Sequence, residues 1–344
     1  MMRAAMYYRN NDIRLENVPK PTIGDEDILI KIHASGICGS DVMEWYRIDK
    51  APLILGHEIA GEIAETGRNV TKFTKGTRVA ATHHVPCYSC HNCRTGHETV
   101  CDLLLSGTHF DPGGFCEYVR LAPVNVERGT WALPDWLSYD AATFVEPLAC
   151  VLRGQRAGGL KPGASVLVLG CGISGILHTH LASVTGAGFI AATDMNTFRM
   201  ATAERFGANK TYTATEDVKQ QFRNDNGGRG ADLVIICTSA ESAFKQGFDA
   251  VERGGTILLF APTADGVSLP LSINNVFWRR DVTITTTYAG SPADCVAALE
   301  LISHNRVQVE EMITHRLKLA DTVEGFKLVA AGGDSLKVIV HPQK

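Results

Sequence analysis

The sequence predicts an α/β protein with an additional β domain, and three observations support this prediction. The chain has 344 residues, too long for one simple core and suited to two domains. Residues 1–150 contain short strand-like runs separated by turns, whereas strands and helices alternate from Ser165 to about Ala289. We therefore expect a β domain over 1–150, a doubly wound parallel-sheet domain over 151–290, and a tail over 291–344 that returns to the first domain.

The first domain shows several strand-like runs with Gly and Pro between them. The runs that predict strands are Asp27 to Ile32, Ile59 to Glu65, Arg78 to Ala81 and Glu117 to Leu121. Short strands with such punctuation are typical of antiparallel sheets. We expect this domain to be antiparallel and partly barrel-like.

After Leu152 the pattern changes to alternating strands and helices. Strands are predicted at Val166 to Leu169, Phe189 to Thr193, Leu233 to Cys237, Thr256 to Ala261 and Val282 to Thr286, with helices near 197–207 and 241–252. This alternation implies a parallel sheet with crossover helices. The tail carries a predicted helix, Asp294 to His304, and a predicted strand, Leu336 to His341. Its return to the first domain would leave a cleft between the domains as the functional site.

A glycine-rich turn separates the first strand of the second domain from the helix that follows. Its sequence is Gly170-Cys171-Gly172-Ile173-Ser174-Gly175. Gly170 permits the tight turn, Gly172 lets backbone amides approach a pyrophosphate, and Gly175 lets the helix pack closely on its strand. Unpaired N–H groups at the start of the helix would face the phosphates, so the turn predicts a dinucleotide site.

An acidic residue ends the second strand of this unit, nineteen positions after the last glycine. Asp194 is placed to accept hydrogen bonds from a ribose 2′-hydroxyl and would repel a 2′-phosphate, which favours NAD over NADP. Arg199 is close enough to weaken that exclusion. Glycines alone often mark ordinary turns, but here strand, helix, second strand and acid follow in order. The candidate cofactor-binding residues are Gly170, Gly172, Ser174, Gly175, Asp194 and Arg199.

The composition is that of an ordinary globular protein, with 45% hydrophobic and 20% charged residues. A formal net charge of −4 gives no basic footprint for nucleic acid. The N-terminal residues have no apolar signal core, and no run approaches the ~18 apolar residues of a membrane span. We therefore expect a cytoplasmic protein with a small-molecule substrate, and no nucleic-acid or membrane partner.

Ten cysteines in such a protein indicate metal binding or catalysis, because disulfides are rare in the cytosol. A polar segment holds four of them with the spacing C-x2-C-x2-C-x7-C: Cys87, Cys90, Cys93 and Cys101. Four thiolates on a short loop can close a tetrahedral shell around zinc, leaving no position for chemistry. The bacterial ferredoxin run differs in its last gap and in the proline that follows. The segment predicts structural zinc; an iron–sulfur cluster, another metal, a redox role or a vestigial site are the alternatives.

A second set of metal-binding side chains is dispersed along the first domain. Cys38 contributes a thiol, His57 an imidazole, and Glu58 and Glu146 two carboxylates. None of these is convincing alone, because a single His after Gly is usually a hydrogen-bonded histidine and Glu-Pro usually starts a helix. Their combination is what predicts a second metal site.

Taken in order and spacing, these motifs resemble the zinc-dependent medium-chain alcohol dehydrogenases. The resemblance covers essentially the whole chain, and its motifs are Cys38-Gly-Ser-Asp, Gly56-His57-Glu58, the four-cysteine segment, Gly113-Gly114-Phe115-x-Glu117-Tyr118, Glu146-Pro147-Leu148 and the glycine-rich turn. The Glu-Pro-Leu motif resembles the branch of sorbitol and other polyol dehydrogenases and of threonine dehydrogenase. The resemblance implies a GroES-like catalytic domain around a Rossmann domain.

The resemblance also implies roles for the dispersed residues. Cys38 and His57 would bind a catalytic zinc, Glu58 would complete its shell directly, and Glu146 stands where the family places a carboxylate that binds the metal or its water. The two glutamates can exchange. Zinc with an open position lowers the pKa of a bound hydroxyl and polarises a carbonyl. Two zinc ions per chain and NAD are therefore expected.

Ser40 matches the hydroxyl that takes the alcohol proton in the family, so it joins Cys38, His57 and Glu146 in the expected catalytic set. In many relatives a histidine three residues further on continues the proton relay, but this chain has Met43. The proton would then leave through the ribose hydroxyls, water or Glu44. Similar proteins are homodimers or homotetramers that meet at the edge of the Rossmann sheet.

Two departures from the sorbitol-type pattern bear on the substrate. Those enzymes share an aromatic residue where this chain has Glu44, and an Arg-Tyr pair where it has Thr287-Tyr288. The missing arginine removes a multi-donor clamp for vicinal hydroxyls or a carboxylate. Threonine dehydrogenases have Thr in place of Ser40. We expect reversible oxidation of a secondary alcohol on a polyol, sugar or related hydroxy compound, with a threonine-type or 2,3-butanediol-type dehydrogenase as the alternative.

Two further classes remain as rivals. A zinc-free enone reductase of the same superfamily would lack the counterparts of Cys38, His57 and Glu146. A non-catalytic cofactor-binding protein would need no open metal site. His84 lies three residues before the four-cysteine segment, where threonine dehydrogenases have a histidine near the substrate, and a structural role for it is equally consistent.

Overall fold

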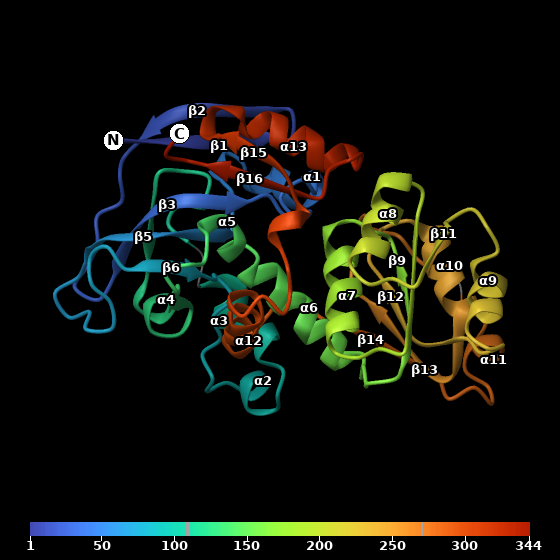
Figure 1. Ribbon diagram of the computed structural model, residues 1–344. Coiled ribbons are helices and arrows are strands. Elements are labelled where there is room, and N and C mark those ends of the chain that lie inside the picture. The colour runs from blue at the N-terminus through green and yellow to red at the C-terminus, as the bar shows by residue number, and fades with distance from the viewer. Residues whose placement is uncertain (108–109, 270) are drawn as a thin grey trace. The chain divides into compact units, whose positions relative to one another are not determined.

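The computed structural model describes residues 1–107, 110–269 and 271–344. Its described residues form two compact units. The first comprises Met1–Ala149 with Ala289–Lys344, and the second comprises Cys150–Tyr288. The C-terminal tail thus belongs to the same unit as the N-terminal residues (Figure 1).

Two sheets form the first unit. The larger has the order β15-β16-β3-β5-β6-β8, with β7 also paired to β3, and the smaller has the order β2-β1-β4. The pairs are antiparallel apart from β15 with β16. The strands are β1 (Met2–Arg9), β2 (Asp12–Val18), β3 (Ile28–Gly36), β4 (Leu53–Ile54), β5 (Glu58–Thr66), β6 (Arg78–Ala81), β7 (Tyr118–Leu121), β8 (Thr130–Ala132), β15 (Ile313–Lys318) and β16 (Lys337–His341).

Short helices, several of them 3-10 helices (η), connect these strands. They are α1 (Glu44–Arg47), η1 (Ile48–Lys50), α2 (His91–Arg94), η2 (Glu98–Val100), α3 (Asp102–Ser106), α4 (Pro123–Arg128), α5 (Tyr139–Ala142), α12 (Pro292–Ser303), η3 (Glu310–Met312), η4 (Leu319–Asp321) and α13 (Thr322–Ala331). The tail helix α12 begins at a capping box, in which Ser291 and Asp294 each accept a backbone N–H of the other.

The pairing of β3 with β5 organises the first unit. Ile28, Ile30 and Ile32 of β3 are buried in one apolar cluster with Ile59 and Ile63 of β5. This alternation of buried residues fixes the register, because a shift by one residue would turn the whole set toward the other face. Figure 1 shows β3, β5 and β6 side by side.

The second unit is a six-stranded sheet in the order β11-β10-β9-β12-β13-β14, and every neighbouring pair is parallel. Its strands are β9 (Ser165–Leu169), β10 (Phe189–Asp194), β11 (Lys210–Thr213), β12 (Ala231–Ile236), β13 (Val251–Leu259) and β14 (Thr283–Thr286). Its helices are α7 (Ile173–Val184), α8 (Thr197–Arg205), α9 (Val218–Asp225), α10 (Glu241–Ala250) and α11 (Ile273–Val276). Helix α6 (Val145–Ala157) begins in the first unit and ends in the second.

The strand order reverses between β9 and β12, which is the topological switch point where doubly wound sheets bind ligands. All five residues of β9 are buried, as expected for a central strand with both faces covered. The predicted fold class, a β domain with a doubly wound parallel-sheet domain, is confirmed. In the part of the chain that the structure describes, no helix has both the length and the apolar character needed to cross a bilayer.

Candidate metal and cofactor sites

The pairing of β3 with β5 brings together three of the predicted metal ligands. Gly36, the last residue of β3, lies opposite Glu58, the first residue of β5. Cys38 therefore lies just after the end of β3, and His57 lies just before the start of β5 at the same end of this strand pair. The thiol, the imidazole and the carboxylate each place one ligand atom within 4.8 Å of the others.

Asp41 supports the two ligands nearest to it. Its carboxylate is fully buried, accepts the backbone N–H of Cys38 at 3.0 Å, and lies 3.4 Å from Nδ1 of His57. Burial disfavours the charged carboxylate, but His57 and then Arg47 outweigh that effect and lower the pKa of Asp41. Contact at Nδ1 leaves Nε2 of His57 as the atom that could face a metal, and metal-bound histidines generally have such a partner at their other nitrogen.

Glu58 has a cation as its partner. Lys337 of β16 forms an ion pair with its carboxylate, and both side chains are fully buried. The pair fills the space above Gly36, where a side chain would overlap both the carboxylate and the Lys337 stem. Burial raises the pKa of Glu58, Lys337 and His57 oppose that shift, and the nearby carboxylate of Glu146 adds to it.

The fourth predicted ligand, Glu146, lies at the start of α6 and is buried. Its carboxylate is 3.2 Å from Nδ1 of His84. The rings of His84 and His83 are 3.8 Å apart, and the ring of His83 lies 5.1 Å from that of His57. Cys38, His57 and Glu58 therefore form one group of candidate ligands, and the contacts of His84 and His83 link Glu146 to His57.

Ser40 lies beside the candidate ligand Cys38. Its hydroxyl and its backbone N–H are each 3.5 Å from the sulfur of Cys38. Arg47 of α1 donates to the hydroxyl and to the carbonyl of Ser40. Glu44, which precedes it in α1, accepts the backbone N–H of Asn10 at 2.9 Å.

The donor set of this first site fits zinc. Zinc accepts thiolate, imidazole and carboxylate ligands, and three protein ligands are typical of a catalytic ion that keeps one position open. The outer contacts of Asp41 and Lys337 are of the kind that hold such ligands in place.

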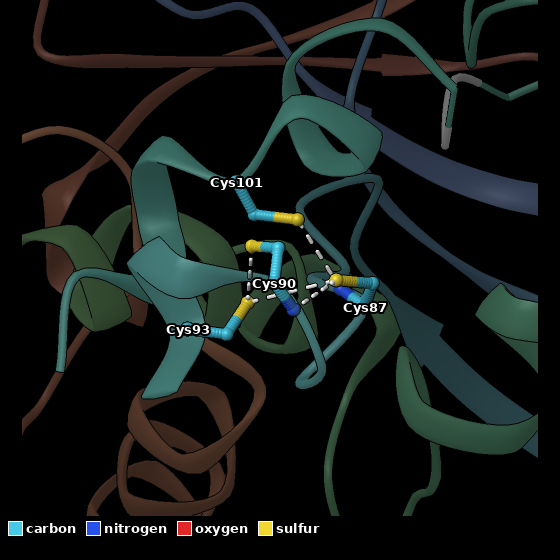
Figure 2. Close-up of side chains that lie close together, drawn as sticks. All are labelled: Cys87, Cys90, Cys93 and Cys101. Carbon is cyan, nitrogen blue, oxygen red and sulfur yellow. Dashed lines mark hydrogen bonds between the residues drawn. The ribbon is translucent and has the colours of Figure 1, made fainter. Parts of the chain in front are cut away.

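The four-cysteine segment forms a second group of ligand atoms (Figure 2). The sulfur of Cys93 lies 3.9 Å from that of Cys87 and 3.5 Å from that of Cys90. Four thiolates around one zinc, with Zn–S bonds of about 2.3 Å, would place sulfurs about 3.8 Å apart. The spacing fits that geometry. Backbone N–H groups of Cys90 and Ser89 also approach the sulfur of Cys87.

These hydrogen bonds prepare the segment to bind a cation. Hydrogen bonds from Ser89 and Cys90 lower the pKa of Cys87 to about 5, which favours its thiolate form. Desolvation and the neighbouring Cys90 thiol raise the pKa of Cys93 to about 12. Four adjacent thiols cannot all ionise without a counter-charge, and a divalent cation supplies it.

In the second unit the glycine-rich turn connects β9 to α7. Gly170 has a φ of +98°, a conformation that side chains disfavour, and a side chain at Gly175 would overlap the carbonyl oxygen of Gly170. Gly172 is the N-cap of α7 and provides no side-chain hydrogen bond to the start of the helix. The first N–H groups of α7 are thus available to a phosphate, and Ser174 lies in this first turn.

Asp194 ends β10 next to this turn. One carboxylate oxygen accepts the backbone N–H of Cys171 at 2.8 Å, and the other accepts that of Asn196 at 2.9 Å. The side chain of Asn196 caps α8 by accepting the N–H of Arg199. The guanidinium of Arg199 is the group nearest to Gly172, 3.8 Å from where a Cβ would stand. The structure thus brings the predicted cofactor residues together around one turn.

Sequence reasoning missed Asp41, Arg47 and Lys337. Asp41 stands inside the quoted Cys38-Gly-Ser-Asp motif, so its position next to a ligand was a usable signal. Lys337 lies 279 residues from Glu58, and only an unexplained charge in the apolar strand β16 marks it. Arg47 reads as a solvated helix residue, and nothing in the sequence connects it with Ser40.

Two family models match the chain. The alcohol dehydrogenase GroES-like domain matches residues 24–135, and the zinc-binding dehydrogenase model matches residues 175–304. The first range contains the thiol, imidazole and carboxylate group and the four-cysteine segment, and the second contains most of the parallel sheet.

Known proteins match over nearly the whole chain. Mouse (Mus musculus) sorbitol dehydrogenase is 30% identical, covering 96% of this chain and 92% of its own. The L-threonine 3-dehydrogenase of Bacillus velezensis is 31% identical, covering 95% of each chain. The crystal structure of Bacillus subtilis 2R,3R-butanediol dehydrogenase is 27% identical with a TM-score of 0.85, covering 99% of this chain and 100% of its own.

Proposed function

This chain belongs to the zinc-dependent medium-chain alcohol dehydrogenases, in the branch of sorbitol and threonine dehydrogenases. We propose the role of each site residue and the class of substrate on that basis. The chain is an oxidoreductase that uses zinc and NAD. Its proposed substrate is a secondary alcohol of a polyol, sugar or related hydroxy compound, oxidised reversibly to the ketone. The observation that carries this proposal is the convergence of Cys38, His57 and Glu58 within 4.8 Å.

In the proposed catalytic site Cys38, His57 and Glu58 hold zinc, and Glu146 takes part as an exchanging carboxylate. The zinc lowers the pKa of an alcohol and polarises a ketone when bound. Asp41 keeps the imidazole of His57 oriented through Nδ1. Ser40 contacts the oxygen of the substrate, which its position beside Cys38 supports.

The proposed structural site consists of Cys87, Cys90, Cys93 and Cys101. Its sulfur spacing supports a closed tetrahedral shell (Figure 2). A shell closed by four thiolates has no open position. This ion would therefore hold the segment around α2 and η2 together and take no part in the reaction.

The proposed cofactor residues are Gly170, Gly172, Ser174, Gly175, Asp194 and Arg199. The uncapped start of α7 supports binding of the pyrophosphate. The carboxylate of Asp194, fixed by the N–H groups of Cys171 and Asn196, supports a preference for a ribose 2′-hydroxyl over a 2′-phosphate.

The substrate preference rests on departures from the sorbitol pattern. Thr287-Tyr288 follows β14 in place of an Arg-Tyr pair, so the multi-donor clamp is missing. The carboxylate of Glu44 already accepts a hydrogen bond from the backbone N–H of Asn10. This contact disfavours Glu44 as the acceptor of the proton released by the alcohol. Among the relatives, threonine and 2,3-butanediol dehydrogenases give the second candidate, an amino alcohol or a vicinal diol.

We further propose a homodimer or homotetramer in the cytoplasm. Strand β14 pairs with β13 and, among the described strands, has no neighbour on its other edge. Such an edge offers unpaired N–H and C=O groups, and Ile273 and Trp278 shortly before it are exposed. None of the ten cysteines, all of which lie in the described part of the chain, forms a disulfide, and this suits a reducing compartment. Light scattering of the purified protein tests the assembly.

The decisive experiment is NADH formation by zinc-replete protein across polyols, simple secondary alcohols, 2,3-diols, sugar phosphates and amino alcohols. We expect one group to be preferred, activity to disappear after zinc is removed by a chelator, and added zinc to restore it. Activity that survives metal loss would support a zinc-free enzyme instead. If the protein turns over none of these groups of alcohols, a substrate attached to a large carrier or a non-catalytic cofactor-binding protein would be favoured.

A further inference from the structure

Arg47 of α1 faces the loop that supplies the candidate ligand Cys38. Its Nε donates to the carbonyl oxygen of Ser40 at 3.0 Å, and its Nη2 donates to the hydroxyl of Ser40 at 3.2 Å. Nη2 also lies 3.8 Å from the buried carboxylate of Asp41. The guanidinium therefore holds two consecutive residues, each of which contacts a proposed zinc ligand.

The chemistry of the guanidinium fixes the direction of these hydrogen bonds. An arginine side chain has only donors, whereas a serine hydroxyl has one proton to donate and two lone pairs. The oxygen of Ser40 must therefore accept from Arg47. Its single proton then points away from Arg47, toward the side on which the sulfur of Cys38 lies at 3.5 Å.

We propose that Arg47 is a positioning residue for the reaction: it holds the oxygen of Ser40 as an acceptor, so that the hydroxyl proton of Ser40 faces the metal site and the oxygen of the substrate. This inference rests on the proposed function. In this arrangement Ser40 donates its hydroxyl proton in a hydrogen bond to the substrate oxygen. The second lone pair of the Ser40 oxygen can still accept a hydrogen bond.

The position of Arg47 is itself well determined. Its side chain is 15% exposed, and its guanidinium carbon lies 4.5 Å from the centre of the Tyr46 ring. The stacking on Tyr46 restricts the orientation of the guanidinium plane, and the two hydrogen bonds to Ser40 fix the direction in which its Nε and Nη2 point. A lysine at this position has no planar fork and would reproduce only part of the contact.

One consequence concerns the proton released in the oxidation. The alcohol loses a hydride to NAD and a proton to the medium, and that proton needs an acceptor. Arg47 accepts none, and the thioether of Met43 accepts none. Neither of these two side chains can therefore relay a proton from Ser40.

A double-mutant cycle tests whether Arg47 acts through Ser40. We expect Arg47→Met to lower kcat about ten- to a hundredfold, with the KM for NAD unchanged and both zinc equivalents retained. We expect Arg47→Met to cause no further loss in the Ser40→Ala background, because the residue that it positions is gone. Additive losses would overturn the inference, as would unchanged turnover of Arg47→Met.

Two further variants separate positioning from general effects of charge and folding. Arg47→Lys keeps the charge and should recover part of kcat, about threefold or more over Arg47→Met. Lys50→Met is the matched control, because the ammonium of Lys50 also lies 4.5 Å from the centre of the Tyr46 ring and Lys50 is exposed. We expect Lys50→Met to retain wild-type turnover. A loss equal to that of Arg47→Met would assign the effect to charge near α1 and overturn the inference.

A readout independent of turnover uses cobalt in place of zinc. Thiolate-to-cobalt absorption responds to hydrogen bonds at the sulfur, and the four-cysteine segment, which is the same in all variants, cancels in difference spectra. Arg47→Met and Ser40→Ala should shift the Cys38 band in the same direction. If the Cys38-to-cobalt band shifts in Ser40→Ala but not in Arg47→Met, the inference about Arg47 is overturned while the proposed function stands. Wild-type protein that binds no metal at Cys38 overturns the proposed function as well.

Discussion

The ammonium of Lys337 and the carboxylate of Glu58 form an ion pair in which both side chains are buried, 0% and 1% exposed. Lys337 belongs to the tail strand β16, whereas Glu58 begins β5 and faces Cys38 and His57. Removing one partner of a buried pair leaves the other charge uncompensated. The tail therefore provides the counter-charge for a proposed zinc ligand.

The first prediction concerns this pair. Lys337→Met should lower the free energy of unfolding of the metal-free protein by about 3–5 kcal/mol at pH 8, measured by urea denaturation, because Glu58 loses its cation. Lys337→Met combined with Glu58→Gln should recover most of the loss, since the uncompensated charge is then absent. Equal destabilisation in the single and double variants would show that packing around the lysine stem is responsible.

The second prediction concerns the four-cysteine segment. Cys93→Ser should reduce bound zinc from two equivalents to one, counted by native mass spectrometry, and should lower the thermal midpoint, because a structural zinc contributes folding energy. Binding of NADH to the second unit should persist. Cys116→Ser serves as the matched control, because Cys116 is buried in the same unit as the four-cysteine segment and lies outside both ligand groups. A Cys93→Ser protein that retains two zinc ions would contradict the assignment.

The fold and much of the site were predictable because local chemistry identifies them. A glycine-rich turn between a strand and a helix predicts a dinucleotide-binding unit from local sequence alone. Closely spaced cysteines likewise predict a metal site without any knowledge of the tertiary structure. Strands β1, β2, β4, β8, β11 and β15 were not predicted. In β2, for example, exposed and half-buried residues alternate with little apolar contrast, so the sequence offers no clear period.

The outer contacts of the site could not be predicted, for a different reason. Lys337, Asp41 and Arg47 act through partners that only tertiary structure brings near them. A lysine in a strand predicts solvent exposure, because long charged side chains are rarely buried without a partner. The partner of Lys337 is fixed by the position of β16 beside β3, which no local pattern encodes.

The third prediction concerns the cofactor turn. In Gly175→Ala the new Cβ would overlap the carbonyl oxygen of Gly170, so α7 must move away from β9. We expect the Kd for NADH, measured by fluorescence titration, to rise about tenfold or more. Ser183→Ala, on the exposed face of the same helix, should leave the Kd unchanged. Wild-type affinity in Gly175→Ala would place the dinucleotide away from this turn.

The fourth prediction rests on a charged contact between α5 and the tail. The carboxylate of Asp140 lies 2.7 Å from Nε2 of His341 and 2.6 Å from Nε of Arg316. Burial disfavours the charged carboxylate, but the hydrogen bonds from His341 and Arg316 outweigh it and lower the pKa of Asp140. A carboxyl group whose pKa is lower in the folded than in the unfolded protein stabilises the fold where it is ionised.

The sign of the pH dependence follows directly. The contribution of Asp140 should be complete above the unfolded pKa, about 3.9 for aspartate, and should disappear as the pH falls through the lower folded value. We expect Asp140→Asn to lower the free energy of unfolding by about 2 kcal/mol at pH 7. The difference from wild type should shrink progressively below about pH 4. Asp135→Asn, which changes an exposed carboxylate in the same segment, should show neither effect. A loss in Asp140→Asn that does not change with pH would mean that the shape of the side chain, and not its charge, holds α5 to the tail.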